Sequence, residues 1–146
     1  MKYKNLYLGV LLGLVVLFVS SLGSGIWYEP ADYTSWPYRM FYGVCHQIPE
    51  RSFLINDVPM AVNSRCFGIF TGLLIAWLAL PLLVRSLYGR NWPVKILGVA
   101  VILQIIDFTG SQLSIWNSSN PLRFVLGVTL GTAVVLVLTE AFKSKK

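Results

Sequence analysis

Two cysteines and the only histidine of the chain are the residues best suited to chemistry. Cys45 and His46 are adjacent in a polar stretch, and Cys66 follows Arg65 at the start of an apolar run. A helix start and a neighbouring cation both favour the thiolate form of a cysteine. Three interpretations stay open: a structural disulfide between Cys45 and Cys66, a metal site, and a redox or nucleophilic thiol with His46 as base or orienting group.

A metal site would need one further ligand, and Asp107 is the candidate. Thiolate, imidazole and carboxylate groups suit zinc in type, and Cys45, His46, Cys66 and Asp107 suit it in number. Adjacent Cys and His residues rarely both bind one ion, however, and the chain has no Cys-x-x-Cys pair. Zinc is therefore one cofactor hypothesis, and Asp107, Cys45 and His46 are also the candidate catalytic residues.

Asp107 belongs to a series of polar residues with helical spacing. At about 100° per residue, the series falls within roughly one quarter of a helix circumference. An acidic group inside a membrane span costs about 2.5 to 3.5 kcal/mol, so it should face the bundle interior or a wet cavity. Asp107 then either pairs with an arginine near the interface or serves a site. The series consists of Gln104, Asp107, Ser111, Ser114 and Ser118.

Three arginines, Arg51, Arg65 and Arg123, are candidates for holding an anionic group. A guanidinium binds a carboxylate or a phosphate through two parallel hydrogen bonds. Arg51 or Arg123 alone would equally suit a surface charge beside lipid head groups. Polar residues expected near the same substrate-binding site are Glu50, Gln112 and Asn120.

The composition places these residues in a membrane protein. Of the 146 residues, 55% are hydrophobic and 12% are charged, whereas a soluble domain carries about 25% charged residues. Four apolar runs each approach the length of about 20 residues that a helix needs to span a bilayer. We expect an all-α integral membrane protein with one domain, residues 1–146, and spans at about 5–27, 66–84, 94–116 and 122–142. A cleaved signal peptide is the alternative for the first run.

Paired glycines favour a four-helix transmembrane bundle. The Gly-x-x-x-Gly spacing lets helix backbones approach closely in lipid, and it serves either packing within a monomer or association of copies into a homo-oligomer. The pairs are Gly9/Gly13, Gly68/Gly72 and Gly127/Gly131.

One long loop, residues 28–65, separates the first two runs. Residues 38–44 are typical of a short interfacial helix, and Asn56-Asp57 between apolar residues suits a hairpin turn. Such a hairpin would fold the chain back and carry Cys66 towards Cys45.

The net charge of +6 follows the ends of the apolar runs, so we expect no nucleic-acid partner. The bilayer itself is the expected partner. With both termini in the cytoplasm, the inner segments hold eight cations and the outer segments four, as the positive-inside rule requires. The inner set is Lys2, Lys4, Arg85, Arg90, Lys95, Lys143, Lys145 and Lys146, and the outer set is Arg39, Arg51, Arg65 and Arg123. The long loop is then non-cytoplasmic.

Several motifs occur in order between the apolar runs: Cys45-His46-Gln47, Pro49-Glu50-Arg51-Ser52-Phe53, Arg65-Cys66-x-Gly68-Ile69-Phe70-x-Gly72, Asp107-x-x-Gly110-x-Gln112 and Ser119-Asn120-x-x-Arg123-x-x-x-Gly127. Over residues 38–131 the chain resembles an uncharacterised family of small prokaryotic membrane proteins, a domain of unknown function. The resemblance implies a multi-pass protein of the prokaryotic cytoplasmic (inner) membrane. It also implies four metal ligands, Cys-His plus Cys-x-x-Cys, but here Asn63 stands in place of the first cysteine of that pair.

Together these features predict an outward-facing polar site of Cys, His, Asp and Arg residues under the long loop. The leading hypothesis is a site, with or without a metal, that binds or acts on a lipid or a small anionic substrate. The alternative is a non-enzymatic structural or accessory membrane protein with a Cys45–Cys66 disulfide. Whether the protein is an enzyme stays open at this point.

Overall fold

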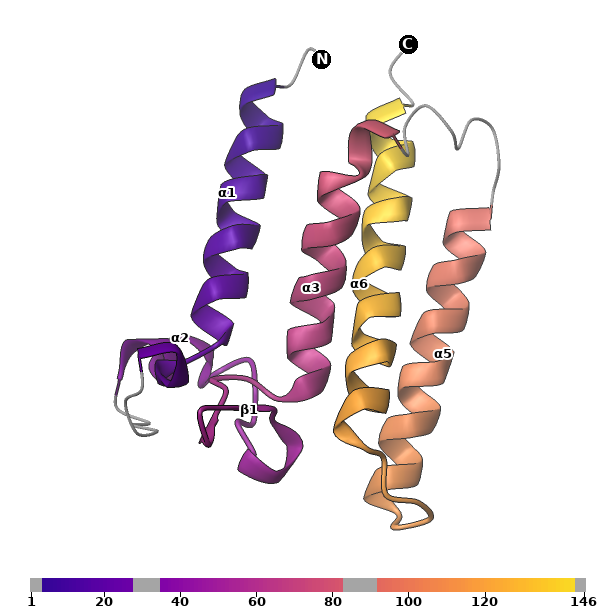
Figure 1. The fold of residues 1–146 in the computed structure, drawn as a ribbon. Coiled ribbons are helices and arrows are strands. Elements are labelled where there is room, and N and C mark those ends of the chain that lie inside the picture. The colour runs from indigo at the N-terminus through magenta and orange to yellow at the C-terminus, as the bar shows by residue number, and fades with distance from the viewer. Residues whose placement is uncertain (1–3, 28–34, 83–91, 144–146) are drawn as a thin grey trace.

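Four long helices lie side by side in a row (Figure 1). The structure, a computed structural model, describes residues 4–27, 35–82 and 92–143. The helices are α1 (Lys4–Ser21), α3 (Ser64–Leu78), α5 (Trp92–Gln112) and α6 (Asn120–Lys143). In this part of the chain α3 packs most extensively on α6, while α5 packs on the other side of α6 and α1 on α3. The arrangement is therefore an open row in the order α1–α3–α6–α5, whereas the sequence led us to expect a compact four-helix bundle.

Three of the helices are long and apolar enough to cross a membrane: Lys4–Ser21, Trp92–Gln112 and Asn120–Thr139. In the most apolar 18-residue stretches of the first two, only 11% and 17% of the residues are buried within the protein, so much of their apolar surface is left for lipid to cover. The fourth helix, α3, has 15 residues, which is about 22 Å at 1.5 Å per residue. Four full spans were predicted; the described residues contain three and one shorter apolar helix.

The early end of α3 has a local cause. The predicted span continued to residue 84, but α3 ends at Leu78 and Ala79 is its C-cap. Pro81 has no N–H to donate, and its ring conflicts with the carbonyl of Trp77, four residues earlier. Residues 80–82 are again helical, and the last two predicted residues of this span, 83 and 84, lie outside the described residues.

Glycines bring α3 and α6 into backbone contact. A Cβ added to Gly68 or Gly72 would overlap the carbonyl oxygen of Phe124 or Val128, and the glycines of α6 meet α3 in the same way. Two of the three predicted glycine pairs therefore pack the helices together. The third pair lies on α1, where a Cβ would meet no atom within 4 Å. The glycines of these pairs are Gly68/Gly72, Gly127/Gly131 and, on α1, Gly9/Gly13.

Short elements form a compact cap between α1 and α3. They are η1 (Ser24–Trp27), α2 (Trp36–Phe41), η2 (Pro49–Arg51), β1 (Leu54–Ile55) and β2 (Val58–Pro59). The strands pair antiparallel through a turn at Asn56 and Asp57, which both have positive φ angles, of 51° and 63°, as a two-residue hairpin turn requires. The predicted interfacial helix at 38–44 corresponds to α2, which begins two residues earlier. Residues 28–34 of the predicted loop lie outside the described residues.

The end of α5 differs from the predicted span at 94–116. Ser114 has a φ of +55°, and the Ile115 N–H donates to the Gly110 carbonyl at 3.0 Å. A left-handed residue followed by such a bond is the Schellman motif that closes a helix. The predicted polar series is therefore helical only at Gln104, Asp107 and Ser111, while Ser114 and Ser118 follow the helix.

Candidate functional site

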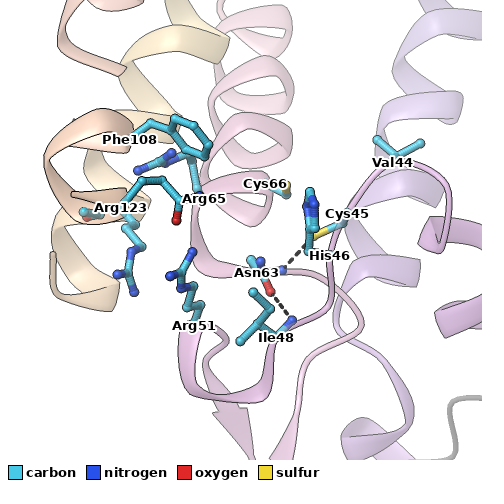
Figure 2. Close-up of a pocket in the computed structure, with 12 residues that line it drawn as sticks. Val44, Cys45, His46, Ile48, Arg51, Asn63, Arg65, Cys66, Phe108 and Arg123 are labelled. Carbon is cyan, nitrogen blue, oxygen red and sulfur yellow. Dashed lines mark hydrogen bonds between the residues drawn. The ribbon is translucent and has the colours of Figure 1, made fainter. Parts of the chain in front are cut away.

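A cavity of about 310 Å³ lies at the end of the row where α3 and α6 begin and α5 ends. Figure 2 shows its arginines on one side, and Cys45, His46 and Cys66 on the other, with Asn63 between them. Seven of the predicted site residues line it, namely Cys45, His46, Arg51, Arg65, Cys66, Gln112 and Arg123. The remaining lining residues are Val44, Ile48, Asn63, Phe108 and Ser111.

Gln47 holds the Cys45-His46 segment against the rest of the cap. Its backbone is left-handed, with a φ of 48°, and its side-chain amide donates to the carbonyls of Tyr38 at 2.6 Å and Ala61 at 2.9 Å. The Tyr38 hydroxyl in turn donates to the Pro59 carbonyl at 2.6 Å. Gln47 in the Cys-His-Gln motif therefore positions the backbone and does not line the cavity.

Asn63 lies between the two sides of the cavity (Figure 2), and it was not predicted as a site residue from the sequence. Its Oδ1 accepts from the Ile48 N–H at 2.8 Å and from the Ser52 hydroxyl at 3.3 Å. Its own N–H donates to the Cys45 sulfur at 3.2 Å. Its position as the residue before α3 was a usable signal, because asparagine is a preferred N-cap. Its amide oxygen here binds the loop instead of the helix.

Cys45 and Cys66 are both free thiols in this structure, so the disulfide that was one interpretation is not formed. Their side chains lie at the same side of the cavity (Figure 2), and the neighbouring Cys66 thiol lowers the pKa of Cys45 to about 6. Burial opposes this shift, while the backbone N–H of Asn63, the backbone at Gln47 and the charge of His46 add to it. Hydrogen bonds to the charged form of an acid stabilise that form. The thiolate form of Cys45 is therefore favoured near neutral pH.

Of the three arginines, only Arg65 has a carboxylate partner among the described residues. Asp107, which is 5% exposed, forms an ion pair with Arg65 and does not line the cavity. The Arg65 Nε is buried without a hydrogen-bond partner in the described part of the chain, as is the Ser111 hydroxyl. Arg51 and Arg65 lie close enough to Arg123 for their charges to repel it. The arginine side of the cavity therefore carries an excess of positive charge.

Asn120 joins the start of α6 to the cap. Its amide nitrogen donates to the carbonyls of Glu50 at 3.2 Å and Ser52 at 3.1 Å, and its Oδ1 accepts from the Arg123 Nη1 at 3.1 Å. Neither Glu50, which is exposed, nor Asn120 lines the cavity. Both were predicted as substrate-binding residues, and in the structure Asn120 positions Arg123 while Glu50 contributes a backbone carbonyl.

The four predicted metal ligands are not brought together. In residues 4–27, 35–82 and 92–143 no group of three or more His, Cys, Asp or Glu side chains is placed to hold a metal ion. Asp107 is engaged by Arg65, and Asn63 stands where the resemblance implies an additional cysteine. The residues of this chain therefore do not fit the four-ligand site that the resemblance implies.

Comparison with known proteins identifies the family to which the chain belongs. No solved structure matches the chain. An uncharacterised protein of Methanocaldococcus jannaschii is 37% identical over 106 residues, which are 72% of this chain and 67% of the relative. An uncharacterised protein of Methanothermobacter thermautotrophicus is 31% identical over 110 residues, 70% of this chain and 90% of the relative. The family model "Predicted membrane protein (DUF2085)" matches residues 45–137, which include every residue that lines the cavity except Val44. The chain therefore belongs to the DUF2085 family of predicted membrane proteins.

Proposed function

We propose that the cavity binds an anionic group, either the head group of a membrane lipid or a small free anion. The observation that carries the proposal is the charge imbalance of Arg51, Arg65 and Arg123 against Asp107. Buried polar groups normally have hydrogen-bond partners, and the Arg65 Nε and Ser111 hydroxyl have none among the described residues. A phosphate or carboxylate oxygen would supply the missing acceptor, and guanidinium groups bind such oxygens strongly.

Apolar residues at the same cavity suit a lipid as the source of the anion. Val44, Ile48 and Phe108 line it beside the charged groups. Phe108 is also 51% exposed on α5, a helix that has many other exposed apolar side chains. A lipid whose chains lie along α5 could therefore place its head group among the arginines.

The proposed location of the cavity is the non-cytoplasmic side. The start of α1 and the end of α6 lie at the opposite end of the row from the cap (Figure 1). The sequence assigns eight cations to the segments on that side of the apolar runs and four to the other side, and the positive-inside rule then favours the first side as cytoplasmic. The proposal includes no metal, because the cavity lacks a converging set of ligands in the described residues.

Binding measurements on the detergent-purified protein test the proposal. We expect inorganic phosphate and nanodisc-embedded phosphatidylglycerol to bind, with Arg51→Gln and Arg123→Gln each weakening the affinity about tenfold or more, as the loss of a charge-assisted hydrogen bond predicts. Stronger binding of phosphatidylglycerol than of phosphate would identify a lipid as the source, and the reverse order a free anion. Nanodiscs of phosphatidylcholine serve as the neutral comparison.

Arg39→Gln is the matched control, because Arg39 is an exposed arginine of α2 that does not line the cavity. It should bind both probes as the wild type does. Equal losses of affinity in the Arg39, Arg51 and Arg123 variants would show that binding depends only on the overall charge, and would overturn the proposed site. Unchanged binding in the Arg51 and Arg123 variants would do the same.

A further inference from the structure

The proposed binding of an anion does not involve the two thiols that line the same cavity. Cys45 and Cys66 are separated by 20 residues, yet both line one side of the same cavity, and Cys66 packs against the cluster that buries Cys45 (Figure 2). A disulfide-forming pair needs two sulfurs that the fold brings together and that a reactant can reach. The chain lacks a Cys-x-x-Cys motif, so its tertiary structure supplies the pairing that this motif supplies elsewhere.

The fold holds the pair in place. Cys45 is buried in a cluster with Tyr38, Phe41, Ala61 and Val62, and Cys66 packs against this cluster. The Cys45 N–H donates to the Phe41 carbonyl at 2.8 Å, and the Cys45 sulfur accepts from the Asn63 N–H at 3.2 Å. Asn63 precedes α3 directly, so the positive end of that helix lies beside the Cys45 sulfur.

We infer that Cys45 and Cys66 form a dithiol that undergoes thiol–disulfide exchange with small anionic disulfides entering this cavity. Cys45 is the attacking thiol, because its sulfur accepts hydrogen bonds that stabilise a thiolate, and its lowered pKa agrees with that role. Cys66 is the resolving thiol, because it packs against the cluster that holds Cys45 and lines the same side of the cavity. The preference for an anionic disulfide rests on the proposed anion site, whereas the exchange between the sulfurs does not.

The exchange proceeds in two balanced steps. The Cys45 thiolate attacks one sulfur of the disulfide R–S–S–R, so that its S–S bond breaks, R–S⁻ leaves and a Cys45–S–S–R mixed disulfide forms. Cys66 then loses its proton to solvent and attacks the Cys45 sulfur, which releases the second R–S⁻ and forms a Cys45–Cys66 disulfide. The protein dithiol is oxidised by two electrons, and the substrate disulfide is reduced to two thiolates.

The test uses the full-length, reduced protein in detergent and 5,5′-dithiobis(2-nitrobenzoate), a disulfide with a carboxylate on each ring. The wild type should release two equivalents of the coloured thiolate, retain no aryl group and lose two hydrogen atoms in intact mass. Cys66→Ser should release one equivalent and retain the aryl group on Cys45. Cys45→Ser should release the thiolate more slowly than Cys66→Ser.

A second disulfide separates the exchange from the anion site. The neutral reagent 2,2′-dithiodipyridine should react with the wild type, Arg51→Gln and Arg123→Gln at similar rates. The anionic reagent should react about tenfold more slowly with these two arginine variants, but at the wild-type rate with Arg39→Gln. If the arginine variants slow neither reagent, the anion preference fails together with the proposed function, and the exchange itself is supported by the mass change alone.

Three results would overturn the exchange. One is a wild-type protein that retains an aryl group on each cysteine, because the two sulfurs would then react independently. Another is a Cys66→Ser protein that releases two equivalents. The third is a folded wild type that releases none while the denatured protein reacts fully, because the cavity would then not admit a disulfide.

Discussion

At the scale of single residues, the state of Cys45 depends on its neighbours in space. The Cys66 thiol is the largest contribution that lowers its pKa to about 6, and burial acts in the opposite direction. An ordinary cysteine has a pKa of about 8.5. Above pH 6 Cys45 is therefore mostly the reactive thiolate, and below pH 6 it is mostly the thiol.

This state predicts a particular pH dependence for alkylation. The rate at Cys45, followed by peptide mass spectrometry with iodoacetamide, should rise with pH through about 6 and then level off. Cys66→Ala should move the rise to higher pH, because it removes the hydrogen bond that contributes most. A wild-type rate that keeps increasing to pH 9 would contradict the lowered pKa.

The Arg65–Asp107 ion pair is the second feature at residue scale, and it predicts how substitutions change the free energy of unfolding. Removing one member of a buried pair leaves the other charge without a partner, at a cost of about 3 to 5 kcal/mol. The Arg65 side chain is 22% exposed, so Asp107→Asn should lower the free energy of unfolding by a value near the lower limit, about 3 kcal/mol.

The double variant Arg65→Gln/Asp107→Asn should recover part of that loss, because no unpaired charge remains. Denaturation of the wild type, the single variants Arg65→Gln and Asp107→Asn and the double variant in the same detergent measures the difference. Additive effects of the two substitutions would show that the pair is not coupled.

At the scale of elements, the α3–α6 contact is the central packing interaction of the row. Its backbones approach closely because Gly68, Gly72, Gly127 and Gly131 place no side chain between them. Dispersion and close packing, and not the hydrophobic effect, drive helix association within lipid. Small residues at this contact therefore matter more than the apolar character of the helices.

Gly72→Leu should destabilise the protein by about 1 to 3 kcal/mol or more, as overpacking of a filled interior does. A Cβ at this position already conflicts with the backbone of Val128 and Thr132. Gly9→Leu is the matched control, because the position on α1 is open. Thermal unfolding in detergent compares the two. Equal destabilisation by both substitutions would contradict the packing seen in the row.

At the scale of the whole molecule, charge distribution predicts orientation. The cap and its cavity lie at one end of the row, and the start of α1, the start of α5 and the end of α6 lie at the other (Figure 1). Lys4 and Lys95 lie at the second end, and the count of eight cations against four along the sequence predicts, by the positive-inside rule, that this end faces the cytoplasm. We therefore predict that the cavity is accessible from outside the cell.

Introduced cysteines test this orientation. In a Cys45→Ser/Cys66→Ser background, Arg39→Cys in α2 should react with a membrane-impermeant maleimide in intact cells. Lys95→Cys, at the exposed start of α5, should react only after permeabilisation. The opposite pattern would place the cavity in the cytoplasm and contradict the predicted topology.

The sequence alone determined what depends on composition and on local chemistry. Apolar runs of spanning length fixed the membrane class, because lipid permits little else for such segments. The Gly-x-x-x-Gly spacing identified the glycines at which α3 and α6 pack, and Asn56-Asp57 predicted the hairpin turn. The ordered motifs between the apolar runs supplied seven of the residues that line the cavity.

Tertiary structure decided what depends on neighbours that are remote in the sequence. The sequence offered pairing with an arginine as one of two roles for Asp107, but only the structure identified Arg65 as the partner. Nor could the motif around Asn120 show that it would bind the cap. The sequence left a disulfide, a metal site and a reactive thiol open for Cys45 and Cys66. The hairpin at Asn56-Asp57 already predicted that Cys66 would return towards Cys45. The packing of the cap against the start of α3 decided that both line one cavity as free thiols, because a contact across 20 residues is set by the fold of everything between them.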